Sequence, residues 1–297
     1  GESSDMVDSV LVAQQLINGM LFGGILVIIA IGLSLIFGVG GVLNFSHGAI
    51  FMIGGYIGLF TAQLTDSFLF AAIAGTIGGF ILGVVIEVGF VRRIRSRDDI
   101  GIAAIMLTLG IAIVLENFMR TTQGSFHQSL PVSFGTAVWN VGPIIVVSRR
   151  VYIFLLAIAA IAGLFAIIKY TKVGLGIQAV AQDRQTALLM GIRPNRIYAI
   201  TFGISAALAG LAGVLLAPLF SIYPSVGWRP FLLAFIVVMI GGLGSLRGTL
   251  VAAVVIALVR SLATTWFSTQ TTFIILFLFM IVVLYLNPQG LKEVVEA

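Results

Sequence analysis

The sequence contains no cysteine, and only 9% of its 297 residues are charged. The lack of cysteine excludes disulfide bonds, thiolate metal sites and cysteine nucleophiles. The scarcity of charge excludes a water-soluble globule of this size, because such a protein has to expose a polar surface. Hydrophobic residues instead make up 60% of the chain. The composition therefore predicts an integral membrane protein, with little chain left for a domain outside the bilayer.

Motifs for nucleotide binding and hydrolysis are also missing. The chain has no G-x-x-x-x-G-K-[ST] phosphate loop, so any coupling to ATP has to come from another subunit. It has no H-E-x-x-H or G-x-S-x-G motif, and His47 and His127 are too isolated to suggest a metal site. Ser46 and His47 are adjacent, so their side chains point apart and do not form a nucleophile and base. We expect no catalysis and no cofactor in this chain.

Apolar runs that can cross a bilayer, about 20 residues each, recur along the sequence. We expect one all-α polytopic membrane domain over residues 1–297, a bundle of about eight or nine transmembrane segments. The first run is long enough to be tilted or broken, and the run at 230–243 is short enough to be half of a discontinuous helix. The expected segments lie at about 9–38, 47–64, 68–91, 100–119, 151–169, 197–218, 230–243, 249–268 and 271–286.

Basic residues predict the orientation, because Lys and Arg near span ends are held in the cytoplasm. Two connections, 92–99 and 169–196, are rich in them, and an even number of spans separates the two, so both are placed in the cytoplasm. Residues 1–10 are acidic and contain no base, so we expect no cleavable signal peptide and place the N-terminus outside. The bases in question are Arg92, Arg93, Arg95, Arg97, Lys169, Lys172, Arg184, Arg193 and Arg196. Because they lie in loops, the net charge of +5 does not indicate nucleic-acid binding.

Small residues recur at every fourth position within the spans. In lipid such rows allow helix backbones to approach closely, so they predict a tightly packed bundle. The rows are Gly19 and Gly23; Ala30, Ser34 and Gly38; Gly75, Gly79 and Gly83; Ala206 and Gly210; and Ala209, Gly213 and Ala217. Acidic residues near the spans have structural explanations: Glu116 is expected to pair with Arg120 four residues on, and Glu87 to lie at the cytoplasmic interface.

The stretch 38–48, GVGGVLNFSHG, predicts a break between two spans. Glycine costs about 1 kcal/mol in a helix interior, and unpaired amides are tolerated at membrane depth only in protein or beside a wet cavity. One interpretation is a substrate path, with Asn44, Ser46 and His47 supplying polar groups next to Phe45 and Gly48. The other is a tight turn at the membrane surface in which Ser46 caps the next helix. The residues alone do not decide between them.

A second glycine-rich break, GGLGSLRG at 241–248, lies in the other half of the chain. Paired breaks in the two halves of a membrane protein are typical of a transporter pathway. In that interpretation Gly241, Gly242, Gly244 and Ser245 face the polar groups of the first break. We therefore take both sets of residues as candidates for the substrate path.

The connection 173–196 is long, basic and helical in pattern. Asp183, Ala187 and Gly191 fall at i, i+4 and i+8, which predicts a stripe of partly small residues that suits the groove of a partner. Gly191 is expected to end the helix, and Pro194 to keep it from resuming. The alternative is an amphipathic helix that rests on lipid headgroups.

Three blocks together resemble the LivH-type permeases of branched-chain amino acid ABC importers. They are GLSLIFGVGGVLNFSHGAIFMIGGYIG at 32–58, AQDRQTALLMGIRPNRIYAITFGISAALAGLAGVLLAP at 181–218 and GGLGSLRGTLVAAVV at 241–255. The first is similar to the family's glycine-containing turn followed by N-[FM]-[SA]-H-G. The second is similar to its A-x-x-x-G loop, here Ala187 to Gly191, which contacts the ATPase subunit. One segment, LTLGIAIVLENFMR at 107–120, resembles a different branch of the family.

This resemblance implies a heterodimer with a LivM-like permease in a prokaryotic cytoplasmic membrane, two LivF- and LivG-like ATPases that bind ATP and magnesium, and an extracytoplasmic amino-acid-binding protein. It implies alternating access for branched-chain or hydrophobic amino acids. Urea, amides or aromatic acids are the alternative substrates, and an autonomous channel or carrier and a membrane enzyme are the alternative classes. The residues it implies for ATPase coupling are Ala181, Gln182, Asp183, Arg184, Ala187, Gly191, Ile192 and Arg193.

Overall fold

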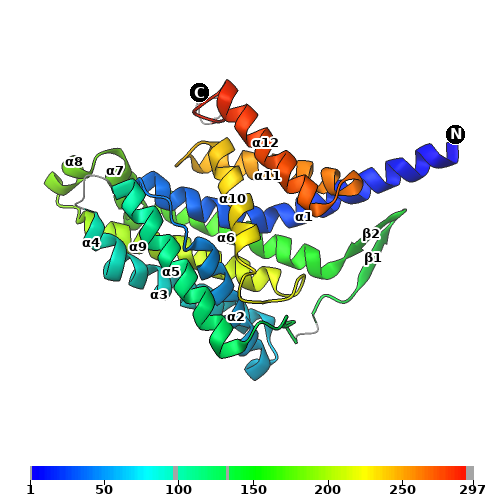
Figure 1. The fold of residues 1–297 in the computed structure, drawn as a ribbon, viewed down its shortest axis with the longest axis horizontal. Coiled ribbons are helices and arrows are strands. Elements are labelled where there is room, and N and C mark those ends of the chain that lie inside the picture. The colour runs from blue at the N-terminus through cyan, green and yellow to red at the C-terminus, as the bar shows by residue number, and fades with distance from the viewer. Residues whose placement is uncertain (1, 96–99, 132–133, 292–297) are drawn as a thin grey trace.

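The structure is a computed structural model that describes residues 2–95, 100–131 and 134–291. The described chain is a bundle of helices, which confirms the all-α membrane class (Figure 1). Within it, eight helices are long and apolar enough to cross a membrane, and α10 (Trp228–Gly241) is an additional shorter apolar helix. The longer helices are α1 (Glu2–Gly40), α2 (His47–Thr65), α3 (Phe68–Ile86), α5 (Ile100–Gln123), α6 (Ser148–Tyr170), α9 (Pro194–Leu216), α11 (Leu246–Trp266) and α12 (Thr269–Leu286).

Short elements extend two of these helices. A π-helical turn η1 (Glu87–Val91) and the short helix α4 (Arg92–Ile94) prolong α3, so that this span runs from Phe68 to Ile94. Two short helices, α7 (Lys172–Gln182) and α8 (Arg184–Leu189), follow α6. The first span, α1, is continuous to Gly40, so it is not broken.

Both basic connections lie at one end of the bundle, as predicted. Figure 1 shows α4, α7 and α8 together at this end, which we call the basic end, and the N-terminus at the opposite end. Residues 96–99 of the first connection, including Arg97, lie outside the described residues.

The rows of small residues pack helix backbones against each other, as predicted. The clearest case is α3 on α9, where Gly75, Gly79 and Gly83 face Gly210 and Ala206 with no room for a Cβ. The same occurs where α1 crosses α11: a Cβ on Gly19 would lie 2.7 Å from Cβ of Ser261, and one on Gly23 would lie 3.1 Å from Cβ of Ala257. Apolar side chains gain little by leaving lipid for each other, so this close approach supplies much of the packing energy.

A β-hairpin at the other end of the molecule was not expected. Strands β1 (Val138–Val141) and β2 (Ile144–Val147) pair antiparallel, with Val141 opposite Ile144. Their sequences, VWNV and IIVV, are rich in β-branched residues, which favour strands. Gly142 takes a positive φ of 62° in the two-residue turn, as primed turns require. The Gln14 side chain ties the hairpin to α1 through 2.9 Å hydrogen bonds with the N–H and carbonyl of Ile145.

The packing predicts that Gly79→Ala destabilises the bundle. The new methyl group would collide with the Ala206 carbonyl of α9, a backbone atom that cannot rotate away, and such overpacking costs about 1–3 kcal/mol. The matched control is Gly110→Ala in the interior of α5, where a Cβ would meet no atom within 4 Å. There, alanine should be neutral or stabilise by up to about 1 kcal/mol. Denaturant titration in detergent micelles measures both, and equal shifts for the two variants would contradict the prediction.

Candidate functional site

The first glycine-rich break is a short non-helical segment between α1 and α2. The helix ends at Gly40, Gly41 takes a positive φ of 64°, and α2 begins at His47. A local turn shapes the segment: the carboxamide oxygen of Asn44 accepts hydrogen bonds from the Ser46 N–H at 3.0 Å and the Ser46 hydroxyl at 2.6 Å. This side-chain bond to the backbone two residues on is the turn-forming habit of asparagine.

His47 anchors the start of α2 to the middle of α1. Its Nε2 lies 3.0 Å from the carbonyl oxygen of Ile29, and since a carbonyl only accepts, Nε2 is the donor. Gly32 makes room for the ring, because a Cβ there would lie 3.1 Å from Cε1 of His47. On the other side, the Phe45 N–H donates to the Thr108 hydroxyl of α5 at 3.0 Å. Residues 45–47 are therefore held between two transmembrane helices, α1 and α5.

These contacts bear on the two interpretations of the first break. Asn44, Ser46 and His47 are completely buried, so this part of the segment is not an exposed turn, whereas Gly41 before it is exposed. Ser46 occupies the N-cap position but makes no side-chain capping bond; its hydroxyl is used by Asn44. Burial in protein is the condition under which a broken helix is tolerated at membrane depth.

The second break, at 242–245, packs on a different part of α1. Gly242 and Gly244 take positive φ values of 91° and 83°. The Ser34 hydroxyl donates to the Ser245 carbonyl at 3.4 Å, and a Cβ on Gly38 would lie 3.1 Å from the Gly244 carbonyl oxygen. Ser245 also caps α11, since its hydroxyl accepts the Gly248 N–H at 3.1 Å.

Gly241 is the last residue of α10, and its closest neighbour is also backbone. A Cβ there would lie 2.6 Å from Cα of Thr249 in α11. The two breaks are thus both seated on α1, with Ile29 and Gly32 beside the first and Ser34 and Gly38 beside the second.

The start of α10 meets the start of α2. The backbones of Gly48 and Gly227 touch, and a Cβ on Gly48 would lie 2.8 Å from the Gly227 carbonyl oxygen. The rings of Phe45 and Phe231 lie 5.3 Å apart, centroid to centroid. Sequence reasoning identified Gly48 and Phe45 but not Gly227, whose close approach to Gly48 depends on contacts far along the chain.

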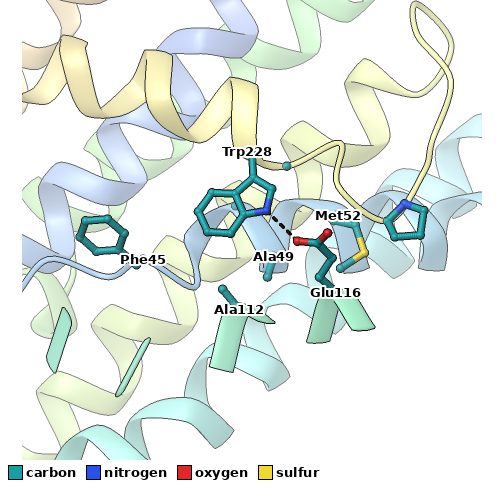
Figure 2. Close-up of a pocket in the computed structure, with 9 residues that line it drawn as sticks. Phe45, Ala49, Met52, Ala112, Glu116 and Trp228 are labelled. Carbon is teal, nitrogen blue, oxygen red and sulfur yellow. Dashed lines mark hydrogen bonds between the residues drawn. The ribbon is translucent and has the colours of Figure 1, made fainter. Parts of the chain in front are cut away.

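A small cavity lies beside this meeting point, between α2, α5 and the start of α10. It has room for about one water molecule. In Figure 2 the Trp228 indole points across the cavity to the Glu116 carboxylate of α5, to which its Nε1–H donates at 2.7 Å. Phe45, Ala49 and Met52 supply apolar walls.

Glu116 also pairs with Arg120 at 2.6 Å, as predicted from their spacing. The sequence interpretation treated that pair as structural and did not place Glu116 in a site. The missed signal is helical periodicity: Thr108, Ala112 and Glu116 follow one another at i+4 spacing, and the first two are buried on the inward face of α5. An acid continuing that face points into the bundle, and such residues usually carry function.

The segment 173–196 forms two short helices rather than one. Helix α7 ends at Gln182, and Asp183 is extended and caps α8, accepting hydrogen bonds from the Gln185 N–H at 2.8 Å and from the Thr186 hydroxyl. These hydrogen bonds hold the pKa of the Asp183 carboxyl below its ordinary value, and the bond from the Thr186 hydroxyl contributes most. Of the coupling candidates, Ala187 is buried and Ile192 partly so, while Ala181, Gln182, Asp183, Arg184, Gly191 and Arg193 are exposed.

Gly191 ends α8 as predicted. It takes a φ of 81°, and the Ile192 and Gly191 N–H groups donate to the carbonyls of Ala187 and Leu188, both at 3.0 Å. This pair of hydrogen bonds is the pattern of a Schellman motif.

Two details of the prediction are wrong. Asp183, Ala187 and Gly191 do not form a stripe on one helix, because α8 covers only Arg184–Leu189 and Ala187 points inward. Pro194 does not delay the next helix but begins α9, since proline fits the first helical position, where no N–H bond is lost.

Comparison with known proteins agrees with this architecture. A family model described as "Branched-chain amino acid transport system / permease component" matches residues 15–284. The chain is 31% identical to the high-affinity branched-chain amino acid transport system permease protein LivH of Salmonella typhimurium, covering 94% of both chains. It is 28% identical to the corresponding protein BraD of Pseudomonas aeruginosa, again over 94% of both chains.

More distant likenesses were also found. The chain is 27% identical to the permease protein LivM of Salmonella typhimurium, over 90% of this chain and 67% of that one. Among solved structures it resembles PsaBC from Streptococcus pneumoniae in complex with Fab, with a TM-score of 0.51, 12% identity and 99% of both chains covered; this likeness concerns the fold alone. The match to the family model over most of the chain, with the LivH likeness, shows that the chain belongs to the family of branched-chain amino acid transport permease components.

Proposed function

We propose that this chain is a permease subunit of an ATP-binding cassette importer and moves branched-chain or other hydrophobic amino acids into the cytoplasm. The observation that carries the proposal is family membership over nearly the whole chain, together with relatives named for high-affinity branched-chain amino acid transport. The similarity to both LivH and LivM supports a heterodimer with a second, LivM-like permease. The other proposed partners are LivF- and LivG-like ATPases, which bind ATP and magnesium, and an extracytoplasmic amino-acid-binding protein.

The proposed location is a prokaryotic cytoplasmic membrane, with the basic end in the cytoplasm and the N-terminus outside. The support is the gathering of Arg92, Arg93, Arg95, Lys169 and Lys172 near one end of the bundle, because basic residues beside spans are retained inside. In this orientation α8 projects toward the ATPases.

The proposed translocation path runs past the two glycine-rich breaks. Residues 44–48 and 241–245 join helices that start or stop inside the bundle, which allows those helices to tilt without breaking a continuous span. ATP-driven closure of the ATPases would move α8 and α9, and the bundle would open to one side at a time. The cavity next to Phe45 and Met52 is largely apolar, which suits an aliphatic side chain and leaves most of the selection to the binding protein.

Helix α8 is the proposed docking element for an ATPase. Its tip exposes Leu188, Leu189 and Met190, the last two at 86% and 78% of full exposure. Apolar side chains exposed beside basic residues in a cytoplasmic loop are costly in water and favour a protein groove. The continuity of α8 with α9 through the Gly191 turn would carry force into the membrane.

Gly191→Arg is expected to abolish coupling between transport and ATP hydrolysis without preventing insertion. The residue is exposed and has a positive φ, and a Cβ added to it would meet no atom within 4 Å. Arginine would therefore strain the end of α8 and project into the docking groove. ATP hydrolysis by the purified four-subunit complex should fall at least about tenfold.

The matched control for this variant is Gly142→Arg in the hairpin turn. Gly142 also has a positive φ, 62°, and no neighbour within 4 Å of a Cβ, but it lies at the opposite end of the molecule. Its ATP hydrolysis should stay near that of the wild type. Normal hydrolysis in Gly191→Arg, or equal loss in both variants, would count against the docking role of α8.

The Asp183 cap predicts a pH-dependent order of α8. Because its pKa is lower in the folded chain, the cap stabilises α8 above the unfolded pKa of about 3.9 and is lost as the pH falls through the lower folded value. Hydrogen exchange of residues 184–189, corrected for intrinsic rates, should therefore be unchanged between pH 8 and 5 and accelerate only in stronger acid. Asp183→Ala should accelerate it already at neutral pH, and Asp183→Asn should not; protection unaffected by Asp183→Ala would rule out the cap.

The function itself is tested in proteoliposomes. Uptake of labelled leucine should require this chain, the second permease, both ATPases, ATP and the binding protein. Leucine flux through this chain alone would indicate a channel or carrier instead. Uptake of urea or amides, but not of leucine, would show that the protein transports the alternative substrates instead.

A further inference from the structure

The two acids within the described spans have different environments. Glu87 is fully buried, and both of its oxygens lie 2.7 Å from Nη2 of Arg95, itself 8% exposed. Glu116 lines the cavity, and its ionic partner Arg120 is 51% exposed. The ion pair of Glu87 and Arg95 is buried on both sides, whereas the exposed Arg120 guanidinium can turn to solvent when another cation approaches Glu116. Of these two acids, Glu116 is the one that lines a cavity.

The start of α2 brings positive character to the same cavity. Gly48 and Ala49 of α2 line it, and within the described chain their N–H groups find no hydrogen-bond acceptor. First-turn N–H groups of a helix are unpaired donors and carry the positive end of its dipole. A carboxylate and the first turn of a helix with two unpaired N–H groups therefore line one small space.

This combination selects among solutes by charge. A simple cation would be attracted by Glu116 but repelled by the helix terminus. A simple anion would be attracted by the helix terminus but repelled by Glu116. An α-amino acid carries an ammonium and a carboxylate on neighbouring atoms, so it satisfies both sides at once. The aromatic and aliphatic walls formed by Phe45, Met52 and Trp228 offer contact for an apolar side chain.

We propose that this cavity is a transient site for a zwitterionic α-amino acid on its way through the permease. Glu116 accepts the ammonium group, and the N–H groups of Gly48 and Ala49 donate to the carboxylate. This inference rests on the proposed transport function and assigns its substrate contacts. It also assigns a direct role to Glu116, an acid whose spacing from Arg120 suggests only a structural ion pair.

In the conformation described, the site is closed. The cavity has room for about one water molecule, and the Trp228 indole occupies one oxygen of Glu116. The site opens when the start of α10 moves away from α5, which frees that oxygen for the ammonium group. The contact between Trp228 and Glu116 thus closes the site on one side, and alternating access requires such a closure.

The test uses the complete complex in proteoliposomes, with labelled leucine and its binding protein, and measures uptake and ATP hydrolysis in parallel. Glu116→Gln keeps the size and the hydrogen-bonding oxygen but removes the charge. It should lower leucine uptake at least about tenfold, while ATP hydrolysis stimulated by the loaded binding protein stays within about twofold of the wild type. Glu116→Asp, which keeps the charge, should recover a substantial part of the uptake.

Arg120→Gln is the control, because it removes the ion pair but leaves the carboxylate. It should transport leucine within about twofold of the wild type. Equal loss in Arg120→Gln and Glu116→Gln would mean that Glu116 serves the ion pair, and it would overturn the site. So would full uptake in Glu116→Gln, or loss of hydrolysis together with uptake in both Glu116 variants. Wild-type complex that hydrolyses ATP without moving leucine would overturn the proposed function, and the site with it.

Discussion

The structure depends on one constraint: backbone polar groups inside a bilayer have no water to bond with. Two helices of this chain nevertheless begin within the bundle, α2 at His47 and α10 at Trp228. They are possible because the segments before them are enclosed by protein. The carboxamide of Asn44 satisfies Ser46, Thr108 satisfies the Phe45 N–H, and the His47 ring ties the turn to α1. Gly48 and Ala49, whose N–H groups are unpaired within the described chain, line a cavity.

Small residues provide that enclosure. Backbone contact between Gly48 and Gly227, and between Gly38 and Gly244, places each break against another main chain. Side chains at these positions would hold the segments apart and expose their amides to lipid. The rows on α3 and α9 act in the same way and bring α2, α3 and α9 together into one tightly packed unit.

This unit connects the basic end with the cavity. Helix α8 leads through the Gly191 turn into α9, α9 packs on α2, and the first turn of α2 lines the cavity. On the other side, α10 reaches the cavity with Trp228 and joins α11 through the second break. Because α5 packs on α2, relative movement of these two groups would change the distance between Trp228 and Glu116, and α9 links α8 to the cavity.

Much of this architecture was determined by the sequence alone. Spans, both breaks, the placement of the two basic connections at one end and the rows of small residues follow from local composition and helical periodicity, which need no knowledge of the fold. The end of α8 at Gly191 is likewise local. The tertiary structure alone decided that α1 continues unbroken to Gly40, that Asn44, Ser46 and His47 are buried, that the second break packs on Ser34 and Gly38, and that Glu116 of α5 meets Trp228 of α10. These contacts join residues up to 211 positions apart, and which distant helices become neighbours depends on how all the packing surfaces fit at once, not on any single stretch of residues.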